Sequence, residues 1–301
     1  MKIATYNVRN LYDAGTFIDD RGTEPVKEGH FKERIAYFIQ KFKTLDLDII
    51  CLQEIGGEKA VTTIGDALGY DYFFAKPNKR GIRMAVLYKK ELANSITCES
   101  ISLGELHIPP IQERGDTDTL KPIAQRRDIL EITLTTPEKV ISINTFHLKS
   151  NLPQYLDGDD EEFDSESHIQ AKFRCILYKT MELCALKKHA NRRIGEGKEV
   201  IFLGDYNENN TASMMDILYS AQTDELRLTD TLSLYQGDKT THMHRGNKLT
   251  FDTIIVSAGL LDTVKEIHIE NSDLRDLSML PLDTVTIESD HALVWMEMGD
   301  R

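Results

Sequence analysis

The chain has 301 residues, of which 41% are hydrophobic and 28% are charged, and its formal net charge is −13. This composition is ordinary for a globular protein, and a chain this long buries enough surface to need no disulfide staple. The acidic balance argues against a broad basic surface for gripping nucleic acid, but it is compatible with a small basic site and with a bound divalent cation.

The chain begins with Met1-Lys2-Ile3-Ala4-Thr5-Tyr6-Asn7, which is typical of a strand and not of a basic and apolar leader. No apolar run is long enough to span a bilayer, so we expect a cytoplasmic protein with no membrane segment. The four cysteines form no Cys-x-x-Cys unit, and we predict buried free thiols in a reducing compartment. They are Cys51, Cys98, Cys175 and Cys184.

The first part of the chain alternates strands with helices. Residues 3–8 alternate in part and predict a strand that ends near Asn7. Apolar residues then recur at helical spacing from Phe31 to Phe42, which predicts an amphipathic helix. A second apolar run at 47–54 predicts a buried strand that delivers Glu54 at its end, and a helix is expected over 59–68.

A run of strands follows, at 70–74, 82–88, 96–103, 127–134 and 140–147, the last of which ends in His147. The sequence Thr135-Thr136-Pro137-Glu138 predicts a hairpin turn between the last two strands. The polar stretch 113–119 and the pair Lys121-Pro122 predict a loop before Arg127.

The acidic stretch 157–162 does not fit a calcium-binding loop. Glu162 stands where such a loop needs its sharp-turn glycine, and His168 stands where the closing glutamate belongs. We predict a solvated surface loop instead. Apolar residues at helical spacing from Ile169 to Leu186 then predict a long amphipathic helix.

The stretch 200–207 combines a buried strand with polar groups at its end. Four apolar residues, 200–203, predict a strand buried on both faces, and Gly204 ends it. Asp205 and Asn207 follow two residues apart, so in an extended segment they face one spot together. A carboxylate beside an amide suits a hard cation, an activated water or a phosphate oxygen. The alternative is an ordinary strand followed by an Asx turn.

The remainder of the chain predicts a helix over 212–219 and strands at 240–244, 249–256, 264–269 and 292–296. No repeat, linker or low-complexity block divides the sequence, so we predict a single domain over 1–301. Asp252 lies inside the apolar strand 249–256, where an unpartnered carboxylate is costly. A histidine is a natural partner, because the carboxylate fixes its tautomer and stabilises its protonated form.

Six short motifs, in this order, resemble those of the endonuclease/exonuclease/phosphatase superfamily, which includes pancreatic deoxyribonuclease and the abasic-site endonucleases. The resemblance runs the whole length of the chain. Each motif alone is weak, and the six in order are strong. They are Thr5-Tyr6-Asn7, Leu52-Gln53-Glu54, Phe146-His147-Leu148, Gly204-Asp205-Tyr206-Asn207, Phe251-Asp252-Thr253-Ile254 and Ser289-Asp290-His291.

The resemblance implies an α/β (α+β) fold in which two packed mixed β-sheets form a sandwich flanked by helices. This is the four-layer deoxyribonuclease-I-like arrangement, with the active site at one end of the sandwich. It also implies a metal site at Glu54, helped by Asn7 and Asp290, that holds Mg²⁺ or Mn²⁺, with Ca²⁺ as an alternative.

The resemblance further implies catalytic roles for five residues. Asp205 and Asn207 would orient or deprotonate the attacking water, and Asn207 and Asn7 would contact the phosphate. His291 would act as general base or stabilise the phosphorane charge, and His147 would act as acid or oxyanion donor. Asp252 would orient a histidine, and the sequence does not show which one. Cleavage of a phosphodiester needs these elements: neutralised phosphoryl charge, an aligned nucleophile and a stabilised leaving group.

Several residues bear on the subclass and the substrate. The abasic-site enzymes have tyrosine where this chain has His147, which disfavours abasic-site repair. Arg127 stands where the family often has a phosphate-contacting arginine, and Arg83 is a second candidate; a surface ion pair is the alternative for each. His242 and His244 share one strand face, but two ligands are too few for a metal pair.

We therefore predict a Mg²⁺- or Mn²⁺-dependent phosphodiesterase, a monomer that acts as a nuclease on DNA rather than RNA. The alternative is a phosphatase or phosphodiesterase for small sugar, nucleotide or lipid phosphates. A binding protein that has lost catalysis is a third hypothesis, disfavoured because the costly polar groups are all present. If the nuclease hypothesis holds, Arg83, Arg127 and Lys149 should ring the same cleft as His147.

Overall fold

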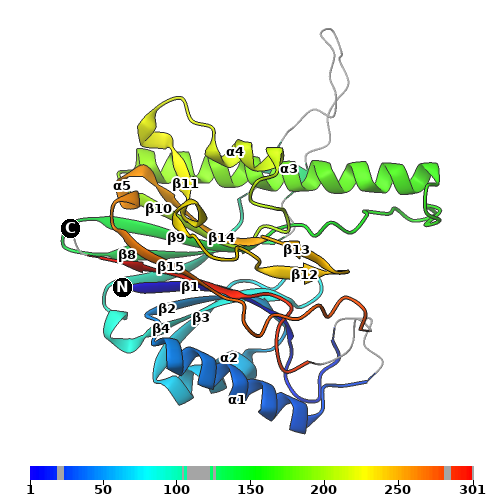
Figure 1. The fold of residues 1–301 in the computed structure, drawn as a ribbon, viewed down its shortest axis with the longest axis horizontal. Coiled ribbons are helices and arrows are strands. Elements are labelled where there is room, and N and C mark those ends of the chain that lie inside the picture. Colours follow the sequence, from blue (N-terminus) through cyan, green and yellow to red (C-terminus); the bar gives the residue numbers. More distant parts are fainter. Residues whose placement is uncertain (19–23, 104, 107–122, 125–126, 281–285, 300–301) are drawn as a thin grey trace.

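The computed structural model describes residues 1–18, 24–103, 105–106, 123–124, 127–280 and 286–299. Two six-stranded sheets pack face to face, and helices cover the outer face of each sheet, which gives four layers (Figure 1). The predicted sandwich is confirmed. Both sheets are mixed, since each contains one parallel strand pair among antiparallel ones.

The first sheet is built mainly from the N-terminal part of the chain. Helices α1 (Glu28–Leu45) and α2 (Glu58–Leu68) cover its outer face (Figure 1). In spatial order its strands are β15 (Val264–Glu270), β16 (Leu293–Met298), β1 (Lys2–Leu11), β2 (Ile49–Ile55), β4 (Arg83–Lys89) and β3 (Tyr70–Phe74).

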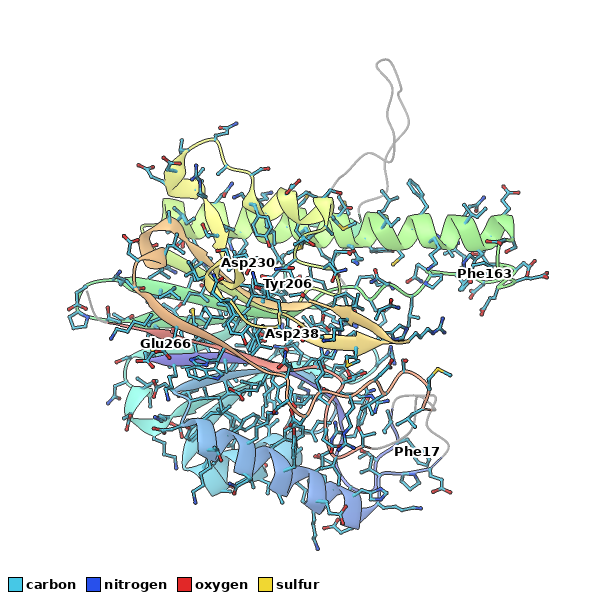
Figure 2. The ribbon with its side chains drawn as sticks, in the orientation of Figure 1. Phe17, Phe163, Tyr206, Asp230, Asp238 and Glu266 are labelled. Atoms are coloured by element: carbon cyan, nitrogen blue, oxygen red, sulfur yellow. The ribbon has the colours of Figure 1, made fainter. Side chains whose placement is uncertain are left out.

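The second sheet carries the long helix α3 (Glu166–Gly195) and the short α4 (Asp216–Tyr219) on its outer face (Figure 1). Part of α3 extends well beyond the sheet, and Phe163 lies at that projecting end (Figure 2). In spatial order the strands are β11 (Leu228–Asp230), β14 (Asp252–Ser257), β10 (Glu199–Asp205), β9 (Val140–His147), β8 (Ile129–Thr135) and β5 (Ile96–Ile101).

Smaller elements complete the described chain. Strands β12 (His242–His244) and β13 (Asn247–Leu249) form a hairpin, and β6 (Glu105–Leu106) pairs with β7 (Ile123–Ala124). Helix α5 (Ala258–Leu261) follows β14. Four 3₁₀ turns lie at Lys90–Leu92, Ser213–Met215, Asp224–Leu226 and Thr231–Leu234.

The alternation of strand residues explains where the polar groups lie. In β9, Ile141 and Ile143 point into the core between the two sheets, and in β10 Ile201 and Leu203 do the same. Side chains two residues apart share a face of a strand. The inward-facing positions of β9 therefore end in His147, and those of β10 end in Asp205. Both polar side chains lie on the inner face, at one end of the sandwich.

One predicted strand is interrupted. The run 249–256 is divided between β13, which ends at Leu249, and β14, which begins at Asp252. Side-chain oxygens take the backbone N–H groups at the break: Asn209 Oδ1 accepts from Thr250 N at 3.0 Å, and Thr241 Oγ1 accepts from Phe251 N and Asp252 N at 2.9 Å. Because these groups are already bonded, the ladder cannot continue through them.

Several smaller predictions can be compared with the structure. The hairpin turn between β8 and β9 is confirmed by the bond from Thr136 N to Lys139 O at 2.9 Å. The acidic stretch 157–162 is a mostly exposed loop. Of the four free cysteines, Cys98 and Cys184 are only half-buried. The loop predicted at 113–119 and 121–122 lies outside the described residues. None of the helices within the described ranges is long and apolar enough to cross a membrane.

Candidate active site

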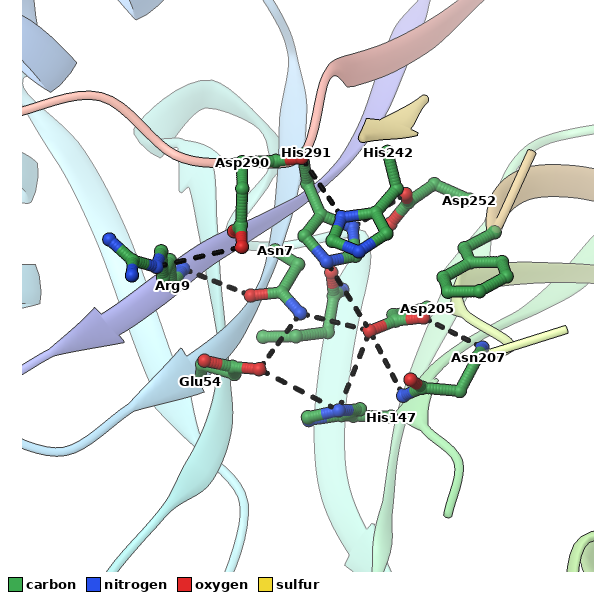
Figure 3. Close-up of polar contacts among 12 residues, drawn as sticks. Asn7, Arg9, Glu54, His147, Asp205, Asn207, His242, Asp252, Asp290 and His291 are labelled. Atoms are coloured by element: carbon green, nitrogen blue, oxygen red, sulfur yellow. Dashed lines mark hydrogen bonds and ion pairs between the residues drawn. The ribbon is translucent and has the colours of Figure 1, made fainter. Parts of the chain in front are cut away.

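Polar side chains from both sheets meet at one end of the sandwich (Figure 3). In the second sheet, Asp205 is the direct cross-strand neighbour of both His147 and Asp252. The Nε2 atom of His147 lies 3.5 Å from Asp205 Oδ2 and 3.8 Å from Glu54 Oε1. The Nε2 atom of His291 lies 3.9 Å from Asp205 Oδ2.

Asn7 joins the two sheets at this point. Its Nδ2 donates to Glu54 Oε1 at 3.1 Å and to Asp205 Oδ2 at 2.9 Å. Its Oδ1 accepts from Arg9 N at 3.0 Å. Asn7 therefore presents its amide nitrogen to the two carboxylates and holds them together, while its oxygen, the atom suited to a metal ligand, is bonded to backbone.

Glu54 reaches the site through an irregularity in β2. Gln53 points inward, since it hydrogen-bonds Thr5 and Thr145, so strict alternation would turn Glu54 outward. A register shift between Leu52 and Ile55 and a left-handed Glu54 (φ +64°) bring its carboxylate inward. Asn10 N donates to Glu54 Oε2 at 2.9 Å. Burial raises the pKa of Glu54 above its ordinary value, against the hydrogen bond from Asn7.

The end of β1 is equally irregular, and a buried arginine from α1 holds it. Arg9 and Asn10 have φ values of +47° and +52°, which are unfavourable for residues with a Cβ. Arg34 is only 3% exposed, and its guanidinium donates to the carbonyl oxygens of Asn10 (2.9 Å), Arg9 (2.5 Å) and Val8. Arg34 thus fixes the turn whose N–H group binds Glu54.

The Asp205 motif ends β10 in a matching way. An added Cβ at Gly204 would lie 2.2 Å from the Phe146 carbonyl oxygen, so glycine is required where β10 passes β9. Asn207 is left-handed (φ +51°); its N donates to Asp205 Oδ1 at 2.7 Å and its Nδ2 to Asp205 Oδ2 at 3.1 Å. Burial raises the pKa of Asp205 to about 6, although His291 acts in the opposite direction.

Helix α3 contributes a buried lysine that holds this turn. Lys179 Nζ donates to Asn207 O at 2.7 Å, to Asn151 Oδ1 at 2.6 Å and to Glu208 Oε2 at 2.5 Å. Each sheet therefore has a left-handed strand end that is held by a buried cation from the helix behind it. Arg34 and Lys179 were not predicted from the sequence. The sequence did contain one sign of them, since each is a cation on the apolar face of a predicted helix.

His291 is oriented by Asp252, which answers the question that the sequence left open. The distance from His291 Nδ1 to Asp252 Oδ2 is 2.8 Å, so Nδ1–H donates and Nε2 faces Asp205. Burial alone would lower the pKa of His291, but the carboxylates of Asp252 and Asp205 raise it well above the ordinary value. The imidazolium form is thus stabilised. Asp252 Oδ1 is buried with no hydrogen-bond partner among the described residues.

His147 has the opposite electrostatic environment. It is 7% exposed, and its Nδ1 has no hydrogen-bond partner within the described part of the chain. Burial lowers the pKa of His147 well below its ordinary value, and the nearby charge of Arg127 adds to this effect. The surroundings therefore favour the neutral form of His147 and the imidazolium form of His291, and pKa values shifted in opposite directions are typical of paired acid and base groups.

Asp290 and His242 lie next to His291. The Asp290 carboxylate lies 3.5 Å from Arg9 Nε, and its backbone oxygen accepts from His242 Nδ1 at 2.9 Å. The rings of His242 and His291 lie 4.3 Å apart between centroids. His242 also stacks on His244 and on Phe251. The His242 ring is thus a wall of the site, and the two strand histidines stack on each other.

The basic residues fall into two places. Arg127 Nη1 donates to His147 O at 2.8 Å and to Leu148 O at 3.0 Å, and Arg127 and Lys149 line one pocket. Arg83 instead forms an ion pair with Glu58 and lies against the Phe74 ring. Arg83 therefore adopts the ion pair that was its alternative interpretation. Arg127 contacts the backbone of His147, but His147 is not among the described lining residues of the pocket that Arg127 shares with Lys149, so one cleft ringed by the three cations and His147 is not what the structure shows.

The donor set suits a divalent cation. Oxygen or nitrogen atoms of Glu54, His147 and Asp205 lie within 4.8 Å of one another, and so do those of His242, Asp290 and His291. Glu54 is buried among other carboxylates, and both burial and the charges of Asp290 and Asp205 raise its pKa. A cation would relieve this repulsion, since buried acids with raised pKa values are stabilised by an added positive charge.

Carboxylates, an amide and two histidines with opposite pKa shifts, at the end of a four-layer sandwich, suit the hydrolysis of phosphate esters. The sequence pattern of the Endonuclease/Exonuclease/phosphatase family matches residues 4–291. The chain belongs to this family. The predicted class, an enzyme that hydrolyses phosphodiester bonds, is thereby confirmed. Comparison with curated protein sequences gives no significant match.

Solved structures with the same fold cover nearly the whole chain. An AP endonuclease from Archaeoglobus fulgidus is 15% identical, covers 99% of each chain and has a TM-score of 0.60. A humanized D. rerio TDP2 with 14 mutations is 15% identical, covers 98% of this chain and 97% of that chain, and has a TM-score of 0.57. The human Nocturnin catalytic domain is 16% identical over 98% of this chain and 93% of that chain, with a TM-score of 0.56.

Proposed function

We propose that this protein is a Mg²⁺- or Mn²⁺-dependent nuclease that cleaves phosphodiester bonds in DNA. The observation that carries the proposal is the convergence of Glu54, Asp205, His147 and His291 within a few ångströms, bridged by Asn7. The AP endonuclease with the same fold supports a nuclease, and the choice of DNA over RNA is a prediction that the experiment below tests.

The chemistry assigned to each residue follows from its contacts. Asp205 accepts hydrogen bonds on both oxygens, and burial raises its pKa to about 6, so it suits the orientation and deprotonation of the attacking water. His291, protonated and oriented by Asp252, stabilises the charge that develops on the phosphoryl oxygens. Neutral His147 donates a hydrogen bond from the other side of the phosphate.

Asn7, Asn207 and Arg127 hold the phosphate in this scheme. The amide nitrogens of Asn7 and Asn207 both point at Asp205, next to the place where the phosphate must bind. Arg127 is anchored to the end of β9 by Nη1. A fixed array of donors costs no reorganisation as charge develops, which is why preorganised donors accelerate the reaction.

Glu54 would hold the metal, with Asp290 on the Arg9 side as a second carboxylate. When bound, the divalent cation supplies Lewis-acid neutralisation of the phosphoryl and leaving oxygens. Asn7 could serve the site in two orientations. Its amide nitrogen could keep bridging Glu54 and Asp205, or the amide could rotate so that Oδ1 faces the cation. Mg²⁺ and Mn²⁺ suit this oxygen-rich set better than softer metals do.

A phosphatase or phosphodiesterase for small phosphate esters is the second candidate. It is favoured by the net charge of −13, which offers no long electrostatic track for a polyanion. The two candidates differ in what they predict about salt. Binding of a polymer should weaken steeply as salt rises, while binding of a single phosphate ester should weaken only slightly.

The deciding experiment measures turnover with and without Mg²⁺ or Mn²⁺ on plasmid DNA, on RNA and on a panel of small phosphate esters. Metal-dependent nicking of plasmid at low salt, lost in Asp205→Asn, would support the proposal. Hydrolysis of a single ester class with no cleavage of either nucleic acid would replace the nuclease with the small-substrate enzyme. No turnover on any substrate in either metal would refute both.

A further inference from the structure

A pocket of about 660 Å³ lies against the end of β9, beside the candidate active site. Four of its lining residues are cations: Lys79 and Arg80 from the loop before β4, Arg127 before β8, and Lys149 after β9. The acid among the lining residues is Glu182, whose Oε2 accepts from Lys149 N at 2.7 Å. The pocket and the site share a wall, because Arg127 donates to the backbone oxygen of His147.

The charge of this pocket runs against that of the whole chain. The chain carries a formal net charge of −13, yet the described residues that line this cavity include four cations and one acid. Like charges gathered around one space repel one another, and a bound anion reduces this repulsion. Both described hydrogen bonds of Arg127 use Nη1, so its other two nitrogens remain for a ligand. Lys79 is exposed and pairs with no acid in the described parts of the chain.

The size and the remaining walls show what kind of anion fits. Pockets of 300–1,000 Å³ are typical for small organic ligands, and a bare phosphate fills only a small part of about 660 Å³. Leu152 and Pro153 contribute apolar side chains to the lining, and Asn78 and Gln154 contribute amides. Leu152 is 62% exposed, so it has apolar surface to bury against a ligand. A phosphate joined to an organic group fits this lining, because the cations can bind the phosphate while the apolar residues and the amides contact the organic group.

We infer that this pocket binds one unstacked nucleotide unit of the substrate, next to the phosphate that is cleaved. The cations neutralise its phosphate, and Leu152 and Pro153 contact its sugar or base. A base within a duplex stays stacked between its neighbours and cannot enter a pocket, so single-stranded or unpaired nucleic acid is favoured. This inference rests on the proposed function and narrows it from DNA in general to unpaired strands.

The test measures binding separately from turnover. In Asp205→Asn protein, affinity for a fluorescein-labelled single-stranded DNA 8-mer is compared with affinity for the same sequence as a duplex. The variant Lys79→Gln/Arg80→Gln is then added; both side chains are exposed, so the fold is retained. Lys90→Gln/Lys172→Gln, which removes two exposed charges elsewhere, is the matched control.

We expect the pocket variant to bind the single strand at least tenfold more weakly and the control variant to bind it normally. The plot of log affinity against log salt should also become shallower by about 0.7, because the pocket neutralises one phosphate and each phosphate contact in a single strand contributes about 0.7. Unchanged affinity in the pocket variant, or a duplex bound as tightly as the single strand, would overturn the inference.

A competition experiment tests the nucleotide part. A nucleoside 5′-monophosphate should displace the labelled 8-mer at concentrations where inorganic phosphate does not, and Leu152→Ala should weaken the nucleotide alone. Equal competition by inorganic phosphate would show a simple anion site and would overturn the inference.

Failure of the proposed function is recognised separately, with a small chromogenic phosphodiester such as bis(4-nitrophenyl) phosphate. The Lys79→Gln/Arg80→Gln enzyme should hydrolyse this substrate at close to the normal rate, since neither side chain is assigned a role in the chemical step and Arg127 is left in place. An inactive wild-type enzyme would refute the proposed function, whereas loss of this turnover in the pocket variant would refute only the separate role of the pocket.

Discussion

Two buried polar clusters contain residues of the second sheet, and they differ in how completely these residues are hydrogen-bonded. In the active-site cluster, His147 Nδ1 and Asp252 Oδ1 have no partner among the described residues. In the second cluster, under α3, Glu131 accepts from Ser142 Oγ at 2.8 Å and from Arg193 Nη2 at 2.6 Å. There His189 Nε2 lies 2.9 Å from Asn144 Oδ1 and 3.2 Å from Glu131 Oε2.

The pKa shifts of the acids follow this difference. Burial raises the pKa of Asp205 to about 6. Burial would also raise the pKa of Glu131, but hydrogen bonds from His189, Arg193 and Ser142 outweigh it and lower the pKa to about 2. The same residue types thus stabilise the fold where every group is bonded, and store unfavourable electrostatic energy where groups are left for a substrate or a metal.

The largest expected effect is on turnover, and it should distinguish the buried histidines of the active-site cluster from the buried His189 of the second cluster. His291→Ala should reduce turnover on the order of 10²-fold or more, the usual scale for a positioned acid or base, and His147→Ala should do the same. His189→Ala, the matched buried histidine, should leave turnover per folded molecule within about twofold. Steady-state kinetics at saturating metal, with the folded fraction measured by circular dichroism, decides this. A loss in His189→Ala as great as in His291→Ala would remove the distinction.

Stability should respond in the reverse order. Glu131→Gln should cost about 3 kcal/mol in the free energy of unfolding, because it leaves Arg193 without its buried charged partner. Asp205→Asn should leave the stability of the metal-free protein at neutral pH unchanged or higher, because it removes a carboxylate that is costly to ionise there. Urea unfolding at pH 7 in the presence of a chelator measures both. A strongly destabilised Asp205→Asn protein would contradict the contrast.

The pH dependence of stability gives a third comparison. The pKa of Glu131 is lowered from 4.5 to about 2 in the folded protein, so its stabilisation is fully present above pH 4.5 and is lost as the pH falls toward 2. Wild type and Glu131→Gln should therefore converge in stability across this window. Unfolding midpoints measured from pH 5 to pH 2 test it, and a constant difference between the two proteins would contradict the lowered pKa.

The residues that support the site should have intermediate effects. Arg34→Lys keeps the charge but loses the fork that reaches three carbonyl oxygens behind Glu54, so we expect about tenfold weaker Mn²⁺ binding. Lys179→Met frees Asn207 and should lower kcat about tenfold while Mn²⁺ affinity stays normal. Titration of Mn²⁺ by electron paramagnetic resonance, together with kinetics, separates the two. Identical profiles for both variants would indicate a general loss of structure instead.

The smallest effect is expected at Arg83. Its ion pair with Glu58, which is 57% exposed, should contribute less than about 1 kcal/mol to stability. Arg83→Gln should change turnover less than about twofold, while Arg127→Gln should reduce it further because that side chain is anchored beside His147. If Arg83→Gln reduced turnover more than Arg127→Gln does, a phosphate contact would be a better interpretation of Arg83 than a surface ion pair.

Much of the fold and part of the site follow from local pattern alone. The extents of β3 and β9 match the strands predicted at 70–74 and 140–147, since alternation and strand propensity are carried by neighbouring residues. The same alternation predicts that His147, Asp205 and Asp252 continue inward rows of apolar residues, because side chains two apart share one face. The six motifs in order also identified the family.

Tertiary structure alone decided how these groups meet. Glu54 faces the site only because β1 and β2 shift register and the backbone becomes left-handed, against the alternation that the sequence predicts. Asp252 pairs with His291, 39 residues away, and Arg34 and Lys179 hold strand ends in other segments. Such contacts depend on the register between strands and on the packing of helices against the sheets. The repeat of apolar residues within a single strand or helix therefore cannot predict them.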